Sequence, residues 1–460
     1  MMGRLEARQS SLFYDFCLDD YVPQDHLLRQ VDAVLDLSGV RRELAPFYSD
    51  IGRPSLDPEL MIRILLIGYL YGVRSERRLV EEVRLNLAYR WFCGLGLTGD
   101  VPERSSFSKT RHGRFRESDA FRRVFESVVR ACLQAGLVDG ETFVTDASVI
   151  EADARIARRA EGEKPPEDWS DPTKVTRPVR EYLDQLDKAA GYELLPGERD
   201  KPPKALSVTD PTAALTSKGK SKIAFAYGTN YLIDAKAAII VDVEATPARG
   251  TAEVAATRLM IERAKERFDL HPEKLAADTA YGSGGNLAWL LAREITPHIP
   301  VLDRSSQTGG VFTRNEFSYD RNADIYVCPT GKALHRATIR SDNGVVIYHA
   351  READCAGCAL KAQCTKAGYR SLSVNAYEEA RQQVAAIAKT DEFKKSFFVR
   401  RKVEMLFAHL KRNLNFRRLR LRGITGARDE CTLAATAQNL RKLVKLIGAS
   451  PPSMVDTCVA

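Results

Sequence analysis

Hydrophobic residues recur at helical spacing through the first 140 residues of the chain. Three segments carry this pattern, 57–73, 75–95 and 117–137, and we predict a long helix in each. Ser75 is a suitable N-cap for the second helix. The segment 101–115 is basic and serine-rich, so we expect a connection there. Short consecutive helices with basic connections suit a helix-turn-helix-like unit, and an all-helical packing domain fits equally well.

The pattern changes after residue 140. Residues 141–152 are rich in β-branched side chains, which favours a strand. From 153 to 222 the chain is polar and rich in Pro, Lys and Glu. We expect an exposed, partly flexible insertion in this region, with one helix near 179–190.

Strands and helices alternate in the next part of the chain. We predict two strands within 222–248 joined around 234–237, a helix at 250–268, a short strand at 274–281, a helix at 283–295 and a strand at 298–302. Together with the strand at 141–152, this gives three strands, then helix, strand, helix and strand. Such a succession predicts a mixed α/β sheet.

Residues 397–411, FFVRRKVEMLFAHLK, predict a further helix. Its apolar face would consist of Val399, Val403, Leu406, Phe407, Leu410 and Leu414. Glu404 lies beside this face on one stripe with Arg400 and Lys411, and it is the only acid from 393 to 428. One interpretation is a solvated helix with an ion pair between Arg400 and Glu404. The other is an acid that serves a function within a basic surface.

Composition indicates an ordinary folded protein of two or three domains, since 44% of the 460 residues are hydrophobic. The net charge of +8 and the pI near 8.9 are mild, but the positive excess concentrates between Lys394 and Arg422. No apolar run approaches the roughly 20 residues of a membrane span. The first residues lack the apolar region of a secretory signal, so we expect a cytoplasmic protein.

Nine cysteines in such a chain do not indicate a disulfide framework. Four of them cluster, namely Cys328, Cys355, Cys358 and Cys364. Four thiolates suit a closed, structural Zn²⁺ site, which we expect to fold a module too small to bury its own core. Reduced thiols without a ligand are the main alternative, and an iron–sulfur cluster is a weaker one. His335 and His349 could replace a cysteine ligand.

The segment Phe397-x2-Arg400-x3-Glu404-x6-Lys411 resembles the Y-x2-R-x3-E-x6-K signature of DDE transposases from bacterial insertion sequences, with phenylalanine in place of tyrosine. Asp146 in FVTDAS and Asp278 in LAADTAYGS are similar to the two upstream aspartates of the family. The N-terminal helices and the cysteine-bearing segment also resemble this family. Within this family, the chain most resembles insertion-sequence group eleven eighty-two.

This resemblance implies an RNase H-like mixed-sheet core with an all-helical N-terminal domain and a small four-cysteine insertion. The implied domains are a helical DNA-binding domain at 1–140, a first part of the core at 141–303 with the polar insertion 153–222, the zinc-type insertion at 304–371, the final core helix with the third motif at 372–423, and a C-terminal helix and tail at 424–460.

The resemblance also implies a chemistry. Asp146, Asp278 and Glu404 would hold two Mg²⁺ or Mn²⁺ ions, with Asp146 between them, because hard cations prefer carboxylate oxygens. Each acid has a structural alternative: Asp146 could end a strand, and Asp278 could cap the helix at 283–295. The expected DNA phosphate contacts are Arg400, Lys411, Arg401 and Arg412.

The expected activity is cleavage of DNA at the ends of an insertion sequence, followed by strand transfer into target DNA. The partners would be double-stranded DNA, as terminal inverted repeats and target, and a second copy of the chain, because two ends must be joined. Such a protein would be bacterial and associated with the nucleoid when bound to DNA. The alternatives are an RNase H-like nuclease without strand transfer and a non-catalytic DNA-binding protein derived from a transposase.

Overall fold

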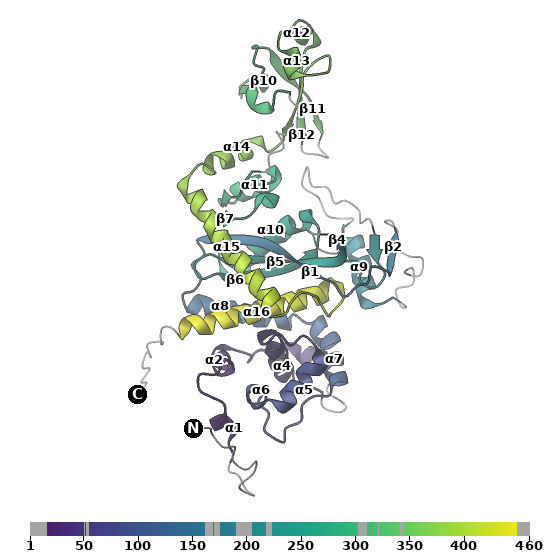
Figure 1. Cartoon of the computed structure of the whole chain (residues 1–460), viewed down its shortest axis with the longest axis vertical. Coiled ribbons are helices and arrows are strands. Elements are labelled where there is room, and N and C mark those ends of the chain that lie inside the picture. Colours follow the sequence, from purple (N-terminus) through teal and green to yellow (C-terminus); the bar gives the residue numbers. More distant parts are fainter. Residues whose placement is uncertain are drawn as a thin grey trace, which may run out of the picture. The chain divides into compact units, whose positions relative to one another are not determined.

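The structure is a computed structural model of the whole chain (Figure 1). The chain folds into two compact units. Unit 1 holds the residues up to Ala135, then His409–Phe416 and those from Thr432 onward, and unit 2 holds Gly136–Ala408 and Arg417–Cys431. The structure describes residues 16–49, 51, 55–161, 169, 175–189, 205–217, 223–301, 311–320, 322–340 and 345–448.

Unit 1 is helical, as predicted for the first part of the chain. Its elements up to Ala135 are α1 (Leu18–Tyr21), α2 (Leu27–Val34), α3 (Val40–Leu44), η1 (Ala45–Phe47), α4 (Pro58–Leu70), α5 (Glu76–Leu85), α6 (Leu87–Phe92), α7 (Arg104–His112), η2 (Arg114–Glu117) and α8 (Ala120–Gln134). Helix α4 begins after its N-cap Asp57, whose side chain accepts hydrogen bonds from the amides of Glu59 and Leu60.

Two predictions for unit 1 were wrong. The helix expected at 75–95 is two helices, because the Asn86 side chain accepts a hydrogen bond from the Tyr89 amide and starts α6. The segment 101–115 contains α7 instead of a plain connection, and Phe107 on its inner side is fully buried. Eleven residues, 93–103, link α6 to α7. This link is longer than the three- or four-residue turn of a helix-turn-helix motif.

Unit 2 is built on a mixed sheet, as predicted, but the sheet has six strands, because β4 in the segment 153–222 joins the five that were expected. Its strands are β1 (Thr142–Glu151), β4 (Ala214–Thr216), β5 (Ala224–Asp234), β6 (Ile239–Pro247), β7 (Lys274–Ala276) and β8 (Thr296–His298). The order is β4-β5-β1-β7-β8, and β6 also pairs with β5. Strands β1, β5 and β6 are antiparallel neighbours, whereas β7 runs parallel to β1 and β8 parallel to β7.

Helices cover both faces of this sheet. On one face lies α10 (Gly250–Phe268), where Thr257 and Thr145 of β1 have hydroxyl oxygens 2.9 Å apart. On the other face lies α15 (Asp391–Arg412), where Phe407 stacks on Tyr231 of β5 with ring centroids 4.7 Å apart. Helix α11 (Gly284–Leu291) lies between β7 and β8 in the chain, at nearly the predicted position.

The polar segment after β1 contains more structure than predicted. The expected helix is confirmed as α9 (Arg177–Ala189), and the strands β2 (Arg159–Glu161) and β3 (Ala205–Ser207) pair with each other in the same segment. Trp169, Val179, Tyr182 and Leu206 form a small core in this region. Short strands with few apolar positions gave no clear alternation in the sequence, which is why they were missed.

The cysteine-bearing segment forms a five-stranded antiparallel sheet. Its elements are β9 (Ser318–Asp320), β10 (Ile325–Val327), β11 (Ala333–Arg340), β12 (Val345–Ala350), β13 (Ser371–Asn375), α12 (Glu352–Ala356) and α13 (Lys361–Cys364). The buried residues are Phe317, Tyr326, Leu334, Val346, Tyr348, Ala350, Leu372 and Val374. The expectation that this module has no core of its own was therefore wrong.

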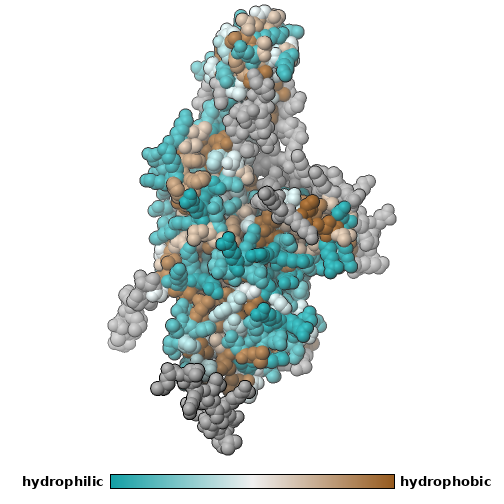
Figure 2. All heavy atoms as spheres, viewed as in Figure 1, coloured by the Kyte–Doolittle hydropathy of each residue, from teal (hydrophilic) through white to brown (hydrophobic). Residues whose placement is uncertain are grey.

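The last helices are α14 (Glu378–Ile387), α15 and α16 (Gly423–Ile447). On the face drawn in Figure 2, hydrophobic residues are scattered in small groups among hydrophilic ones. Among the described helices, none is both long and apolar enough to cross a membrane.

Candidate active site

Asp146 lies in β1, and Asp278 lies two residues beyond the neighbouring strand β7. Strands β1 and β7 are parallel, and Val144 is the register partner of Ala276. Two residues further along each segment stand Asp146 and Asp278. Since adjacent strands are about 4.8 Å apart, this register brings together two acids that are 132 positions apart in the sequence.

Local hydrogen bonds orient these two acids. Asp146 accepts a hydrogen bond from the Ala147 amide at 2.8 Å, and it lies within β1 instead of ending it. Asp278 accepts from the Ala280 amide at 2.8 Å and caps the 3-10 turn η4 (Thr279–Tyr281). Both residues are half-buried. Asp278 is thus a cap, though of η4 and not of the following α-helix.

Glu404 is exposed on α15, and α15 is anchored to the sheet on both sides of it. Before Glu404, the Lys402 ammonium donates to the Ala235 carbonyl, just beyond β5. After it, Phe407 stacks on Tyr231. Tyr231 is the register partner of Asp146, and paired residues of antiparallel strands project from the same face. Glu404 therefore lies on the helix that covers the face bearing Asp146.

The predicted apolar face of α15 is confirmed. Its buried members are Val403, Leu406, Phe407, Leu410 and, beyond the helix end, Leu414, and Val399 is half-buried. The alternative ion pair between Arg400 and Glu404 is absent, because Glu404 has no hydrogen bond or ion pair with any residue that the structure describes. The Arg400 guanidinium instead lies 5.8 Å from the centre of the Phe397 ring.

The other predicted DNA contacts lie along the same helix. Arg401 is exposed, and its guanidinium lies 5.1 Å from the centre of the Phe398 ring. Lys411 and Arg412 lie in the last turn of α15, within unit 1. Phe397 and Phe398 are 56% and 61% exposed, so aromatic surface alternates with positive charge around Glu404.

The three acids do not form a closed metal cage. In the described part of the chain, no three Asp, Glu, His or Cys side chains converge closely enough to hold a metal ion. The donor set is nevertheless suited to a hard divalent cation, because all three groups offer carboxylate oxygens. Asp146 and Asp278 follow paired residues of β1 and β7, and Glu404 lies on α15, which covers the face of Asp146.

Sequence reasoning missed two residues beside this site, Glu253 and Tyr281. Burial raises the pKa of Tyr281 well above its ordinary value, and the nearby carboxylates of Glu253, Asp146 and Asp278 raise it further. Tyr281 belongs to the motif around Asp278, so it was visible in the sequence as a neighbour. Glu253 stands in the first turn of α10, where the sequence offered no signal for it.

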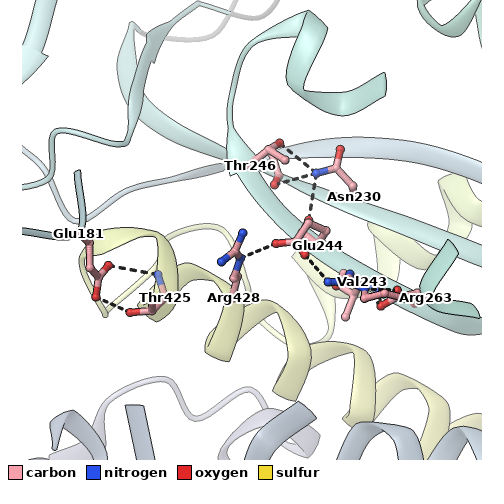
Figure 3. A network of polar contacts seen from close by, with 10 residues as sticks. Glu181, Asn230, Val243, Glu244, Thr246, Arg263, Thr425 and Arg428 are labelled. Carbon is pink, nitrogen blue, oxygen red and sulfur yellow. Dashed lines mark hydrogen bonds and ion pairs between the residues drawn. The ribbon is translucent and has the colours of Figure 1, made fainter. Parts of the chain in front are cut away.

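A buried polar network lies at β6 and fixes α10 (Figure 3). Glu244 accepts from Arg263 of α10 at 2.7 Å and from Arg428 of α16 at 2.5 Å, using different oxygens. Asp242 also accepts from Arg263, at 2.7 Å. The Asn230 amide donates to the Glu244 carbonyl at 3.0 Å. Both acids are 3% exposed and have arginine partners, which indicates a structural role.

A second polar contact ties the polar segment to the start of α16. Glu181 of α9 accepts from the Thr425 hydroxyl at 2.5 Å and from its amide at 3.3 Å (Figure 3). Nearby, the Tyr227 hydroxyl donates to Asp210 at 2.5 Å. Asp210 is fully buried, and this burial raises its pKa to about 6 despite the hydrogen bond from Tyr227.

The four clustered cysteines, Cys328, Cys355, Cys358 and Cys364, line one small pocket. The Cys328 sulfur accepts a hydrogen bond from the Lys332 amide at 3.3 Å and lies 3.0 Å from the Thr330 hydroxyl. Partial burial raises the pKa of Cys328, but these hydrogen bonds lower it more, and the net shift is downward. His335 and His349 face each other across β11 and β12 and are not among the residues that line the pocket.

Two protein families match parts of the chain. Residues 16–113 match a family described as transposase domain (DUF772), and residues 327–444 match one described as transposase DDE domain. Neither match covers half of the chain. The second includes Glu404 and the four cysteines, whereas Asp146 and Asp278 lie between the two. Both matches support a transposase of the DDE type.

Comparison with solved structures finds a piggyBac transposase synaptic complex with hairpin DNA, at a TM-score of 0.32 and 8% identity. The match covers 94% of this chain and 80% of that chain. A likeness at this level does not establish a shared fold. No curated protein matches the chain.

Proposed function

We propose that the chain is a DNA transposase of insertion-sequence group eleven eighty-two that cleaves DNA at the element ends and joins them to target DNA. Asp146, Asp278 and Glu404 would be its catalytic acids. The observation that carries this proposal is the register of β1 and β7: Asp146 and Asp278 follow the paired residues Val144 and Ala276 by two positions each, and Glu404 lies on the helix that covers the face of Asp146. The DDE-domain match over residues 327–444 supports the same assignment.

An RNase H-like core is part of this proposal. It is supported by three antiparallel strands, β1, β5 and β6, followed by α10, β7, α11 and β8, with the last two strands parallel to β1. This succession is the one that the sequence pattern predicted. It pairs the first three residues of β1 with β7, so that Asp146 and Asp278 each follow this paired stretch by two residues.

Asp146, Asp278 and Glu404 would hold Mg²⁺ or Mn²⁺, which supplies positive charge to the attacking and leaving oxygens of the phosphodiester. The chain's own part is to orient the acids and the DNA. The Lys402 contact to Ala235 and the stacking of Phe407 on Tyr231 fix α15, and with it the position of Glu404. Arg400, Arg401, Lys411 and Arg412 would bind phosphates.

DNA binding by the N-terminal helical domain, residues 1–140, is also proposed. It is supported by α7, whose inner side buries Phe107 and Arg111, the latter paired with Glu76 at 2.8 Å. The exposed residues of α7 are Arg104, Ser105, Ser106, Lys109 and His112. This outward face combines positive charge with short hydroxyl side chains, which suits contacts to phosphates and base edges.

A structural zinc ion held by Cys328, Cys355, Cys358 and Cys364 is a further part of the proposal. Its support is the single pocket that all four thiols line, together with the amide hydrogen bond to the Cys328 sulfur. Because this sheet buries its own core, we expect zinc to stabilise the pocket end of the sheet and not to determine the whole fold. Purified protein that carries no zinc would contradict this assignment.

One assay tests the main proposal. The full chain is incubated with labelled duplexes from both flanks of its coding region, Mg²⁺ or Mn²⁺, and a target plasmid. Joined products would support a transposase, which as a homodimer brings two ends together. Cleavage without joining would indicate a nuclease, and shifted but uncut DNA would indicate a DNA-binding protein, and either result would overturn the proposal.

A further inference from the structure

Helix α15 exposes large apolar side chains next to the proposed site. Phe397 and Phe398 are 56% and 61% exposed, and Met405 is 71% exposed. Phe407 of the same helix, by contrast, stacks on Tyr231 of the sheet. Single exposed apolar side chains are common on protein surfaces, but three of them within nine residues of one helix require an explanation.

These side chains follow the helix in two stripes. Phe398, Arg401 and Met405 are separated by three and then four residues, a spacing that places them along one side of the helix. The residues directly before them repeat this spacing and form a neighbouring stripe that ends at Glu404. Six residues separate Phe398 from Glu404, so the Cα atoms of these two residues are about 10 Å apart in an α-helix.

The surface around the exposed rings is positively charged. The Arg401 guanidinium lies 5.1 Å from the centre of the Phe398 ring, and the Arg400 guanidinium lies 5.8 Å from the centre of the Phe397 ring. Both distances are in the range of a cation–π interaction. From 393 to 412, Glu404 is the only acid of α15. A second copy of the chain would bring the same positive charge to this surface and be repelled, whereas a polyanion is attracted to it.

Among the parts of a DNA molecule, the faces of unpaired bases fit such a surface best. A paired duplex presents phosphates and sugars to the protein, and its base faces are covered by the neighbouring base pairs. Exposed aromatic side chains bind single strands by stacking on base faces, and arginines beside them strengthen the contact. A basic surface with exposed rings therefore suits a strand whose bases are accessible.

We propose that Phe398 and Met405 form a surface on which unpaired bases of the DNA stack, with Arg401 beside them. This inference rests on the proposed function and describes the substrate of the same site. The unpaired bases would lie within about three nucleotides of the phosphate that is cut, because about 10 Å separate Phe398 from Glu404 and a base step is about 3.4 Å. Phe398 and Met405 stand outside the four positions of the transposase signature, which assigns them no role.

DNA binding in the absence of divalent ions tests this inference separately from cleavage. Three molecules share one duplex sequence: a blunt duplex, a duplex with a short unpaired tail, and a duplex whose tail is abasic and so keeps the phosphates without the bases. In a fluorescence anisotropy titration, we expect the unaltered full chain to bind the normal tail about tenfold more tightly than the abasic tail. Equal affinity for the two tails would overturn the inference.

Variants of Phe398 assign the preference to the proposed surface. Phe398→Ala should lose the preference for the normal tail, and Phe398→Trp should keep it, because a larger ring still stacks. Leu259→Ala is the matched control and should keep it too, since Leu259 is 45% exposed on α10. The loss in Phe398→Ala should be equal at low and high salt, because stacking releases no counterions, whereas Arg401→Gln should reduce the salt dependence of binding.

The remaining outcomes separate this inference from its alternatives. If Phe398→Ala keeps the preference and instead changes the molecular mass of the protein in solution, the surface is an interface between copies and the inference is wrong. If the unaltered protein joins DNA ends but does not distinguish the normal tail from the abasic tail, only this inference fails. If it binds none of the three DNA molecules, the proposed function fails as well.

Discussion

The acids of unit 2 fall into two groups with opposite surroundings. Asp242 and Glu244 are 3% exposed, and arginines occupy their oxygens. Glu404 is exposed on α15 without a partner in the described part of the chain, and Asp278 accepts a hydrogen bond from an amide of its own turn. The buried acids are neutralised by arginines, whereas Glu404 and Asp278 of the proposed site keep carboxylate oxygens available.

The physical reason is the cost of desolvation. Removing a carboxylate from water costs several kcal/mol, and only a close partner such as Arg263 offsets this cost. An exposed or half-buried carboxylate keeps its water and needs no such partner. The two groups should therefore respond differently to the same substitution: the buried acids through stability, and the acids of the proposed site through activity.

The largest effect is expected for Glu404→Gln. This change removes one charged oxygen donor and should slow DNA cleavage by about a thousandfold or more, or about 4 kcal/mol of activation free energy. The melting temperature should stay the same, because Glu404 is exposed. Glu392→Gln is the control on the same helix, since Glu392 is also exposed and lies 3.3 Å from Lys274. Normal cleavage by Glu404→Gln would remove it from the site.

Glu244→Gln should have the opposite profile. The neutral amide leaves Arg263 with Asp242 alone and Arg428 without an acid partner among the described residues, and breaking a buried ion pair costs about 3 kcal/mol. Urea unfolding should show this loss, while DNA cleavage by the folded fraction stays near normal. Glu262→Gln, at a surface pair, should change stability by less than about 1 kcal/mol. Equal urea midpoints for the two variants would contradict the distinction.

Asp210 is a buried acid to which no arginine among the described residues donates a hydrogen bond, and its contribution to stability should depend on pH. Burial raises its pKa from an ordinary value near 4 to about 6, so the folded state binds the proton more tightly than the unfolded state does. Its contribution to stability is greatest below pH 4 and is lost as pH rises to about 6. The penalty at pH 7 is about 3 kcal/mol.

Asp210→Asn removes this titration and keeps an oxygen that can accept from the Tyr227 hydroxyl. The variant should therefore be more stable than the unaltered protein at pH 7 and similar to it at pH 4, as measured by the difference in urea midpoint across this range. A difference that does not change with pH would show that Asp210 is not protonated in the folded state at low pH.

The helices and strands that carry the proposed site could be predicted, because each follows from the residue pattern of one short segment. Helix α10 and the apolar face of α15 follow from helical periodicity within one segment, and the strands of the central sheet follow from runs of β-branched residues. By contrast, α7 has few apolar residues and reads as a connection. The sheet of the cysteine module consists of strands of three to eight residues, too short for a clear alternation.

The arrangement of the acids was open to prediction only in part. The resemblance selected Asp146, Asp278 and Glu404 from motif spacing, but spacing says nothing about whether their side chains meet. Their placement depends on the pairing of β1 with β7, which closes a loop of more than a hundred residues. Glu253 belongs to no motif, and its position became visible only through the contact of α10 with β1.

The smallest effect is expected for an acid between the two groups. Asp153 is 33% exposed and pairs with Arg418 at 2.8 Å and with Arg422 at 2.9 Å. Exposed pairs contribute about 0.5 kcal/mol each, so Asp153→Asn should lower the free energy of unfolding by about 1 kcal/mol. The same change removes a negative charge beside two guanidinium groups, and DNA binding should tighten severalfold at low salt, with the gain disappearing as salt increases. Filter binding at two salt concentrations measures this change in DNA affinity.

A large loss of stability without any gain in DNA affinity would place Asp153 with the structural acids Asp242 and Glu244.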